Sequence, residues 1–537
     1  MKLAEEEVHQ TNSEWRITLS QTLAVMAKNV LVIAFATSLA YPAMLVPSLS
    51  GNDPNELFHL NESELSWIAS INLMCVPIGC LFSGMVTQPI GRKKAMQYIN
   101  IPFVFCWIIF YFATELWHIY FALSVLGLFG GLVEAPLFVY VSEVTQPNLR
   151  GLLSATTSIA GALGILIQFI LGSLFNWRIV ALACSSVPLI CFILLWFIPE
   201  SPYWLISKNR IEHAKESLAW LRGWTEPKHI ELEFENICKN NQVCISKNNI
   251  EERSESHADQ DNDTKTLLKK IEAFVKKSFW WPFSMVSFIY FLSHFTGGTT
   301  LRIYAVKLFS TLEVPLDKYY ATVLIGVAEV LGAITAVLLI RRTGKRVMVF
   351  ISIAGVGISN VVIAGYAYAM DVKYLVIYDE IEQTPILDLE GFKWLPLVFF
   401  ILLAYTTQCG LRILPWILIG EIYSHEVRAV SCGISGAISF ILSFVSNKVF
   451  LSTISSITIA GTYWMHAAFS FFGLVVVYFT LPETEGKTLE EIIDHFSGIS
   501  KLEKGIGVKG KYKTNHGNIK VLNVENLNYR FYSESNL

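Results

Sequence analysis

Charged residues are scarce in this sequence. Asp, Glu, Lys and Arg make up 16% of the 537 residues, against about 25% in a typical soluble domain. The 41 Lys and Arg are balanced by 44 Asp and Glu, so no basic excess points to a nucleic acid as a partner. The nine Cys show neither metal-ligand spacing nor a disulfide framework, so no metal or cofactor is expected. No phosphate-binding loop of the G-x-x-x-x-G-K-[ST] type occurs either, and no enzyme class is indicated.

Long apolar segments make up most of the chain. Hydrophobic residues make up 53% of the chain, and windows of about 20 apolar residues, enough for a helix to cross a bilayer, occur twelve times. The two sets of six are residues 22–46, 67–86, 95–114, 118–141, 153–175 and 179–198, and residues 283–308, 320–340, 347–370, 394–419, 430–453 and 460–481. We therefore expect an all-α membrane protein with twelve transmembrane helices in contact with the lipid bilayer.

The two sets predict two helical bundles, at residues 22–198 and 279–481. A linker at residues 199–278 joins them, and it combines helical parts with a charged, disorder-like part. Residues 1–21 and 482–537 are polar and form the termini. The chain is thus expected to have five segments.

Basic residues in the short loops predict the orientation of the helices. Arg92–Lys94 follow the second window of the first set, and Arg341–Arg346 follow the second window of the second set. The loop after the first window has acidic residues but neither Lys nor Arg. Because Lys and Arg are retained on the cytosolic side, both termini and the linker are expected in the cytosol, in a multi-pass plasma-membrane protein. Asn61, in Asn61-Glu62-Ser63, is then a glycosylation site on the outer side.

Three short motifs occur once in each set, at corresponding places. They are a glycine followed by basic residues, a Glu followed by an Arg seven residues later, and Pro-Glu-Ser or Pro-Glu-Thr. Because a guanidinium can bind a carboxylate with two hydrogen bonds, we expect a cytosolic gating network that forms when that side closes. Its residues are Arg92, Glu143, Arg150 and Glu200 in the first set, and Arg346, Glu421, Arg428 and Glu483 in the second.

These motifs resemble the signatures of the sugar porter family of the major facilitator superfamily. The resemblance extends from about residue 25 to 495, and it is strongest in PESPYWL at Pro199–Leu205 and PETEGKTLEEI at Pro482–Ile492. In style the sequence is similar to the insect facilitated trehalose transporters. The resemblance implies two pseudo-symmetric six-helix bundles that carry a small molecule, a sugar, by alternating access.

The resemblance also implies how transport is driven. Proton-coupled members of the family carry an acidic residue in the first helix, and Ala36 stands near that position here. Facilitated diffusion of a trehalose-like or hexose-like sugar is therefore expected. Glu134 is left as a different candidate for a proton carrier.

The residues with which the family binds sugar are largely replaced in this sequence. Trp416 keeps the ring that stacks on sugar, whereas His294 and Glu329 stand where the family has Gln and Asn. Gln408, Arg412 and Trp416 are spaced i, i+4, i+8, which predicts one shared helix face. The candidate substrate-binding residues are Trp416, Gln408, Gln168, His294, Thr299, Glu329, Ser439, Arg302 and Arg412.

Arg302 and Arg412 leave two interpretations open. In the first interpretation, one of the two arginines binds an anionic group of the substrate, and the protein is a carrier of an organic anion. In the second, Glu329 pairs with one of the two arginines inside the membrane. A third alternative is a membrane nutrient sensor that does not transport, based on the altered site and on the polar tail at residues 506–537. The sequence does not give the oligomeric state or the identity of the substrate.

Overall fold

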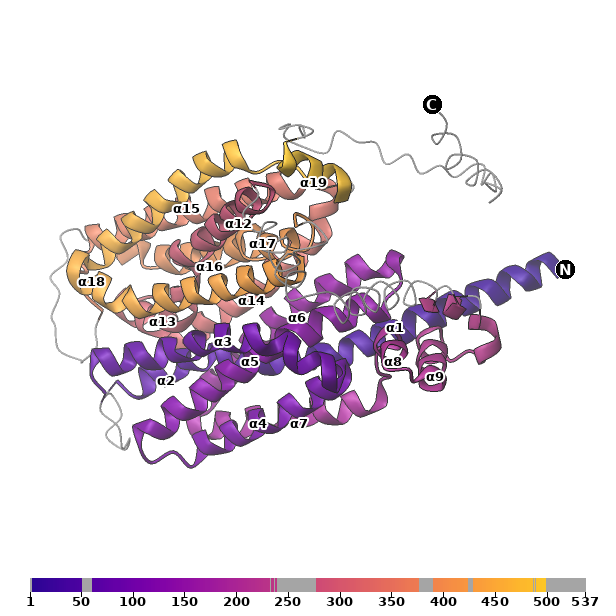
Figure 1. The fold of residues 1–537 in the computed structure, drawn as a ribbon. Helices are drawn as coiled ribbons and strands as arrows, with labels where there is room; N and C mark the ends of the chain where they lie inside the picture. The colour runs from indigo at the N-terminus through magenta and orange to yellow at the C-terminus, as the bar shows by residue number, and fades with distance from the viewer. Residues whose placement is uncertain are drawn as a thin grey trace, which may run out of the picture.

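The protein consists of helices arranged in two bundles that lie side by side (Figure 1). The computed structural model describes residues 2–50, 60–238, 277–375, 390–423 and 428–498, apart from positions 232, 236, 486 and 488. Every element in these ranges is a helix. The disorder-like run at residues 248–264 and the tail at residues 506–537 lie outside the described residues.

The first bundle is formed by the helices that precede the linker. The N-terminal start of the chain and the last described helix, α19 (Leu489–Ser497), lie toward one end of the molecule, here termed the terminal end, as Figure 1 shows. The helices of this half are α1 (Lys2–Ala40), α2 (Pro42–Ser48), α3 (Glu62–Ile90), α4 (Arg92–Tyr111), α5 (Leu116–Val144), α6 (Pro147–Leu174) and α7 (Trp177–Phe197).

The second bundle repeats this arrangement with more interruptions. Its helices are α12 (Lys277–Phe295), α13 (Gly298–Thr311), α14 (Lys318–Thr343), α15 (Lys345–Ala369), α16 (Leu395–Thr406), the π-helix η3 (Thr407–Leu411), α17 (Leu414–Leu418) and α18 (Arg428–Thr480). The short helix η2 (Glu390–Phe392) precedes α16, and α19 (Leu489–Ser497) follows α18.

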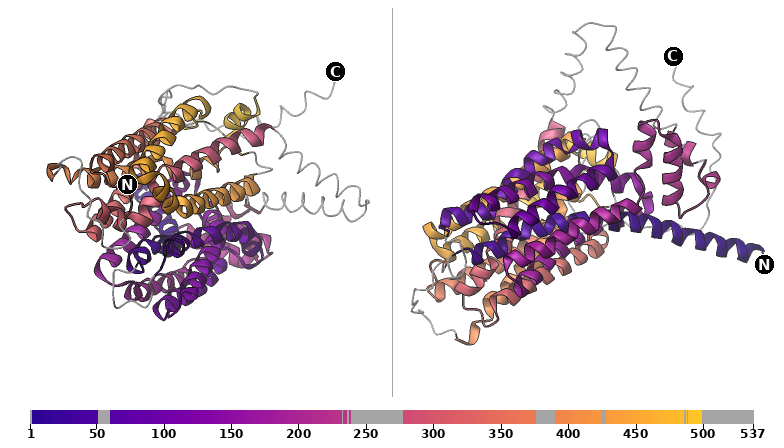
Figure 2. Two further views of the ribbon diagram at one scale, coloured as in Figure 1. Left: turned by 90° about the vertical axis from the view of Figure 1, so that its left-hand side faces the viewer. Right: turned by 90° about the horizontal axis from the view of Figure 1, so that it is seen from below.

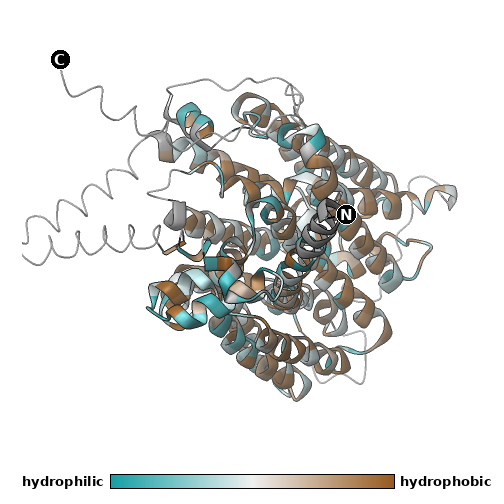
Figure 3. Ribbon diagram, turned by 90° about the vertical axis from the view of Figure 1, so that its right-hand side faces the viewer, coloured by the Kyte–Doolittle hydropathy of each residue, from teal (hydrophilic) through white to brown (hydrophobic). Residues whose placement is uncertain are grey.

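The expected twelve membrane spans are present. Nine segments of the described chain are long and apolar enough to cross a membrane. One of them lies in α18, which holds two such helices that meet at Thr458, where φ is 69°. The 20-residue α4 and the pair α12–α13 add two further spans. Large apolar side chains are exposed around the outside, as expected for contact with lipid, and Figure 3 shows these helices in brown.

Small residues allow the helices to approach closely. A Cβ added at Gly79 of α3 would lie 2.0 Å from the Leu128 carbonyl oxygen of α5, and one at Gly131 would lie 2.1 Å from that of Val76. Glycine at such positions lets two membrane helices pack backbone to backbone, which gains van der Waals contact where no hydrophobic force operates.

Several spans are interrupted part of the way along their length. α1 gives way to α2 at Tyr41–Pro42, and α12 gives way to α13 at Gly297, where φ is +93°. Between α16 and α17, the π-helix η3 inserts an extra residue into the turn. Irregular backbone within a membrane span is tolerated where it lines a cavity, so these breaks mark the region in which a substrate site is expected.

The linker contributes a small helical unit at the terminal end. Its elements are α8 (Pro202–Ser207), α9 (Ile211–Leu221) and the 3-10 helix η1 (Pro227–Ile230). Trp204, Leu218 and Phe234 are buried together in a separate apolar cluster. This unit lies beside the N-terminal helix α1, as Figure 2 shows.

Candidate substrate-binding site

A cavity of about 180 Å³ lies between the two halves, beside the helix breaks. α1, α3 and α6 line it from the first half, and α12, α13, α17 and α18 line it from the second. The lining residues that carry the argument are Tyr290, His294, Thr299, Arg302, Arg412, Trp416, Ser439, Ser443 and Asn447. Polar groups therefore gather on the wall that the second half provides.

Trp416 lies in an aromatic cluster at this wall. Its ring centroid is 5.5 Å from that of Tyr290, edge-on, and 6.1 Å from that of Phe440. Phe138 of α5 stacks on it across the boundary between the halves, at 6.3 Å. Such packing fixes the orientation of the indole and leaves it on the cavity surface, where an aromatic face suits a sugar ring.

Arg302 lines the cavity and is hydrogen-bonded to two residues, Glu329 and Gln408, that lie behind the cavity wall. Its Nε donates a hydrogen bond to Glu329 Oε1 at 2.5 Å, and its Nη2 donates to Gln408 Oε1 at 3.3 Å. The Glu329 side chain is only 3% exposed. Of the two arginines, Arg302 is therefore the one that pairs with Glu329.

His294 joins three helices at the centre of the site. One ring nitrogen, Nδ1, is hydrogen-bonded to Thr299 Oγ1 at 3.0 Å, and the other, Nε2, to Ser439 Oγ at 3.1 Å. Thr299 Oγ1 also accepts a hydrogen bond of 3.2 Å from Arg412 Nη2. The side chains of Arg412, Thr299, His294 and Ser439 thus form one continuous polar chain across the cavity wall.

Most of the candidate residues meet at the cavity, but three do not. Gln408 and Glu329 lie behind it, in contact with Arg302. The expected shared face of Gln408, Arg412 and Trp416 is wrong for Gln408, because the π-helix η3 changes the register between Gln408 and Arg412. Gln168 lies at a small neighbouring cavity and accepts a hydrogen bond from Cys184 Sγ at 3.2 Å.

Four polar residues of the lining were not predicted from the sequence, namely Tyr290, Ser293, Ser443 and Asn447. A signal for two of them was available. Ser439, Ser443 and Asn447 are spaced i, i+4, i+8 and thus share one face of α18. Asn447 Nδ2 donates to the Ser443 carbonyl oxygen, which turns the side chain back along that face.

The gating residues of the first half form a network at the terminal end. Arg92 holds Glu143 with two hydrogen bonds, from Nε at 3.1 Å and from Nη2 at 3.0 Å. Glu200 accepts hydrogen bonds from the backbone N–H groups of Arg92, at 3.0 Å, and Lys93, at 2.9 Å. A carboxylate is favoured there because those N–H groups begin a helix and have no partner within it.

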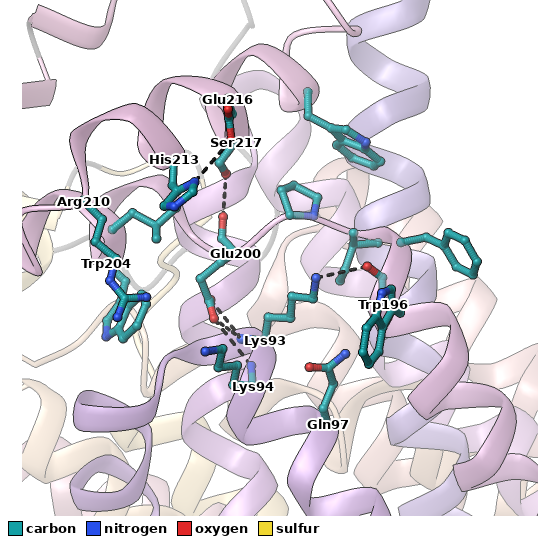
Figure 4. A pocket seen from close by; sticks show the side chains of 15 residues that line it. Lys93, Lys94, Gln97, Trp196, Glu200, Trp204, Arg210, His213, Glu216 and Ser217 are labelled. Atoms are coloured by element: carbon teal, nitrogen blue, oxygen red, sulfur yellow. Dashed lines mark hydrogen bonds and ion pairs between the residues drawn. The ribbon is translucent and has the colours of Figure 1, made fainter.

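Figure 4 shows Glu200 between the start of α4 and Ser217 of α9, whose hydroxyl donates to the Glu200 carbonyl oxygen. Burial raises the pKa of the Glu200 carboxyl, and the hydrogen bonds from the backbone oppose that rise. The residue thereby ties the linker unit to the first bundle.

The second half repeats this network with one change of partner. Glu483 accepts hydrogen bonds from the backbone N–H groups of Lys345, at 3.1 Å, and Arg346, at 3.0 Å. Glu421 pairs with Lys345, at 2.7 Å. Arg346 donates to the Tyr478 carbonyl oxygen. Burial raises the pKa of the Glu421 carboxyl, and Lys345 opposes the rise.

One of the two remaining members of the predicted network, Arg150, forms no ion pair with a described residue. Arg150 is exposed and donates to the Thr145 carbonyl oxygen at 3.4 Å. The side chain of Arg428 lies outside the described residues. Within the described part of the chain, each ion pair of the network joins residues of the same half.

Comparison with known proteins agrees with this architecture. A family model described as "Sugar (and other) transporter" matches residues 29–496. Similar curated proteins include the facilitated trehalose transporter Tret1 of Culex quinquefasciatus, 27% identical over 89% of this chain and 86% of that one. The Bombyx mori protein of the same name is 27% identical over 88% and 86%.

The solved structures that resemble this fold include the xylose transporter XylE from E. coli. A partially occluded inward-open form superposes with a TM-score of 0.65 at 15% identity, covering 88% of this chain and 99% of that one. The complex with 6-bromo-6-deoxy-D-glucose gives 0.63 at 17% identity, covering 90% and 98%. The fold is that of the major facilitator superfamily, and the chain belongs to the sugar (and other) transporter family.

Proposed function

We propose that this protein carries a sugar across the membrane by facilitated diffusion. The observation that carries the proposal is the cavity between the halves, which has an indole face beside a chain of hydrogen-bonding groups. An aromatic face packs on the apolar face of a sugar ring, and polar groups form hydrogen bonds with the hydroxyl groups around the ring. The names of the curated relatives support a sugar as the cargo.

The cavity volume favours a small cargo. About 180 Å³ is below the roughly 300 Å³ at which pockets for drug-sized ligands begin. A monosaccharide suits this space better than a disaccharide in the conformation described. The α1 residues that line the cavity, Leu39 and Ala40, are apolar, which supports transport that is not driven by protons.

Alternating access would follow from the arrangement of the contacts. At the end opposite the termini, the halves touch through Ser66, whose hydroxyl donates to the Lys448 carbonyl oxygen at 2.9 Å, and through Trp67 and Phe444. At the terminal end, the charged networks stabilise each half separately. Rocking of the two bundles about the central cavity would then expose it to one side at a time.

We also propose that the terminal end faces the cytosol and that the protein resides in the plasma membrane. The basic start of α4 lies at that end, next to the linker unit, and the corresponding start of α15 lies against Glu483, which follows the last span. Lys and Arg are retained on the cytosolic side during insertion, which supports this orientation.

Counterflow in proteoliposomes tests the proposed function. Purified protein is loaded with unlabelled glucose or trehalose, and exchange of the labelled sugar is followed. We expect glucose exchange that falls at least tenfold in Trp416→Ala and is partly retained in Trp416→Phe. Trp464→Ala is the matched control, because Trp464 is 47% exposed on α18. Sugar binding without exchange would overturn the transport proposal and favour a sensor.

A further inference from the structure

The cavity wall carries more positive than negative charge. Arg302 and Arg412 both line it, whereas Glu329 is the carboxylate that lies against them. In the first half, Lys28 and Glu134 interact electrostatically with each other and so offset one another. Among the described residues around the cavity, one guanidinium charge therefore has no carboxylate of its own.

Arg412 is the guanidinium that lacks a counter-charge. Of its five side-chain N–H groups, one donates to an acceptor in the described chain, the Thr299 hydroxyl. Its Nε is buried without any hydrogen-bond partner among the described residues. An unpaired charge at membrane depth is costly and persists where it faces a cavity or a ligand, so Arg412 marks a ligand site.

The neighbours of Arg412 define what such a ligand looks like. Trp416 lies one turn along the same span and also lines the cavity, and the hydroxyl groups of Thr299 and Ser439 lie on the same wall. A ligand that fills this cavity therefore meets an aromatic face, several hydrogen-bonding groups and a free guanidinium. We propose that the cargo is a sugar acid whose ring lies against Trp416 and whose carboxylate binds Arg412.

This inference rests on the proposed function and narrows its substrate. A guanidinium offers a carboxylate two parallel hydrogen bonds, which are stronger than those to a neutral hydroxyl. The excess of one positive charge matches the single charge of a carboxylate. A phosphate monoester, with a charge of about −2 at neutral pH, would leave an uncompensated negative charge in the membrane.

Glucose and glucuronate form a matched pair of probes, because they differ only at carbon 6, which is a hydroxymethyl group in glucose and a carboxylate in glucuronate. We expect wild-type protein to exchange labelled glucuronate with a KM about tenfold below that for glucose, a difference of about 1.4 kcal/mol. In Arg412→Gln, which keeps an N–H donor for Thr299, glucuronate exchange should fall at least tenfold. Any fall in glucose exchange in that variant should be smaller than the fall in glucuronate exchange, so that the preference for glucuronate over glucose is lost.

Two further variants separate charge from shape. Arg412→Lys keeps the charge without the planar fork and should retain part of the glucuronate preference. Arg178→Gln removes an arginine that bonds the Ala113 carbonyl oxygen far from the cavity, and it should change neither KM.

The outcomes distinguish this inference from the proposed function. Exchange of glucose without exchange or inhibition by glucuronate would overturn the inference and leave the proposed function standing. Glucuronate exchange that is unchanged in Arg412→Gln would overturn the role of Arg412. Exchange of neither compound would overturn both proposals.

Discussion

Glu329 and Arg302 are costly residues for a membrane interior, and each is tolerated because of the other. Their 2.5 Å hydrogen bond lies where the Glu329 side chain is 3% exposed. Removing one partner of a buried pair leaves an uncompensated charge and typically costs about 3–5 kcal/mol, whereas removing both is often close to neutral. We expect Glu329→Leu to lower the thermal unfolding temperature in detergent strongly, and Arg302→Leu/Glu329→Leu to recover most of the loss.

Gln408 helps to define the control for this prediction. It accepts a second hydrogen bond from Arg302, so Gln408→Leu removes a neutral partner and leaves the charges paired. Its loss of stability should be about 1–2 kcal/mol. A double variant that is no more stable than Glu329→Leu would contradict the pairing argument.

Asn61 provides a test of orientation. It is exposed at the start of α3, where its side-chain oxygen accepts a hydrogen bond from the Glu64 N–H. Substitution of Asn61 would therefore confuse loss of the cap with loss of a glycan. Ser63→Ala removes the glycosylation signal and leaves the cap, so we expect it to abolish a glycosidase-sensitive mobility shift seen in wild-type protein made in insect cells. Absence of the shift in both proteins would contradict an outer location.

At the residue scale, the sequence identified those site residues that stand out by residue type alone. His294, Arg302 and Arg412 are conspicuous because polar groups are rare in apolar spans, and all three line the cavity. Gln408 has the same chemistry but lies behind Arg302. No feature of the local sequence distinguishes the two situations, because the direction of each side chain depends on the helix interruptions.

At the scale of single helices, the repeated glycine at the start of α4 and α15 has a specific physical cause. Gly91 has φ +103° and Gly344 has φ +88°, in a region that L-residues rarely adopt. An added Cβ would also lie 2.6 Å from Glu200 Oε2 or 2.5 Å from Glu483 Oε2. We expect Gly91→Ala and Gly344→Ala each to cost about 1–3 kcal/mol of stability, measured by thermal unfolding in detergent.

Helical glycines in open space are the matched controls for these variants. A Cβ at Gly84 of α3 or Gly365 of α15 would meet nothing within 4 Å. Because alanine is the better helix former, Gly84→Ala and Gly365→Ala should be neutral or slightly stabilising. Equal losses in all four variants would show that membrane helices here tolerate no added methyl group, and the capping explanation would fail.

The number and order of the helices were predictable from sequence, but their interruptions were not. Windows of apolar residues predict spans because the bilayer sets their length. The break at Gly297 and the π-helix at Thr407–Leu411 leave the apolar pattern unchanged. They are fixed by tertiary contacts, such as the Ser352 hydroxyl that donates to the Thr406 carbonyl oxygen and accepts from the Leu411 N–H.

At the scale of the whole molecule, the duplicated motifs predict two related halves, and the contacts show how the halves are held. Within each half, a carboxylate after the last span covers the start of the third, through Glu200 in one and Glu483 in the other. Between the halves, the contacts at the end opposite the terminal end include the hydrogen bond from Ser66 to the Lys448 carbonyl oxygen, the Trp67–Phe444 ring contact and a cation–π contact, in which Lys448 Nζ lies 3.9 Å from the centroid of the Trp67 ring. Each of these contacts is individually weak, as a rocking mechanism requires.

The contact between Ser66 and Lys448 allows this mechanism to be tested directly. If the halves must separate at that end during each cycle, a covalent link there should stop transport. We expect oxidation of Ser66→Cys/Lys448→Cys to reduce sugar counterflow at least tenfold and a reductant to restore it. The control pair, Asn29→Cys/Thr156→Cys, joins two side chains 2.9 Å apart within the first half, where no separation is needed. Full exchange by the oxidised Ser66→Cys/Lys448→Cys protein would show that the halves stay in contact at this end throughout transport, because the disulfide would then join two surfaces that never separate.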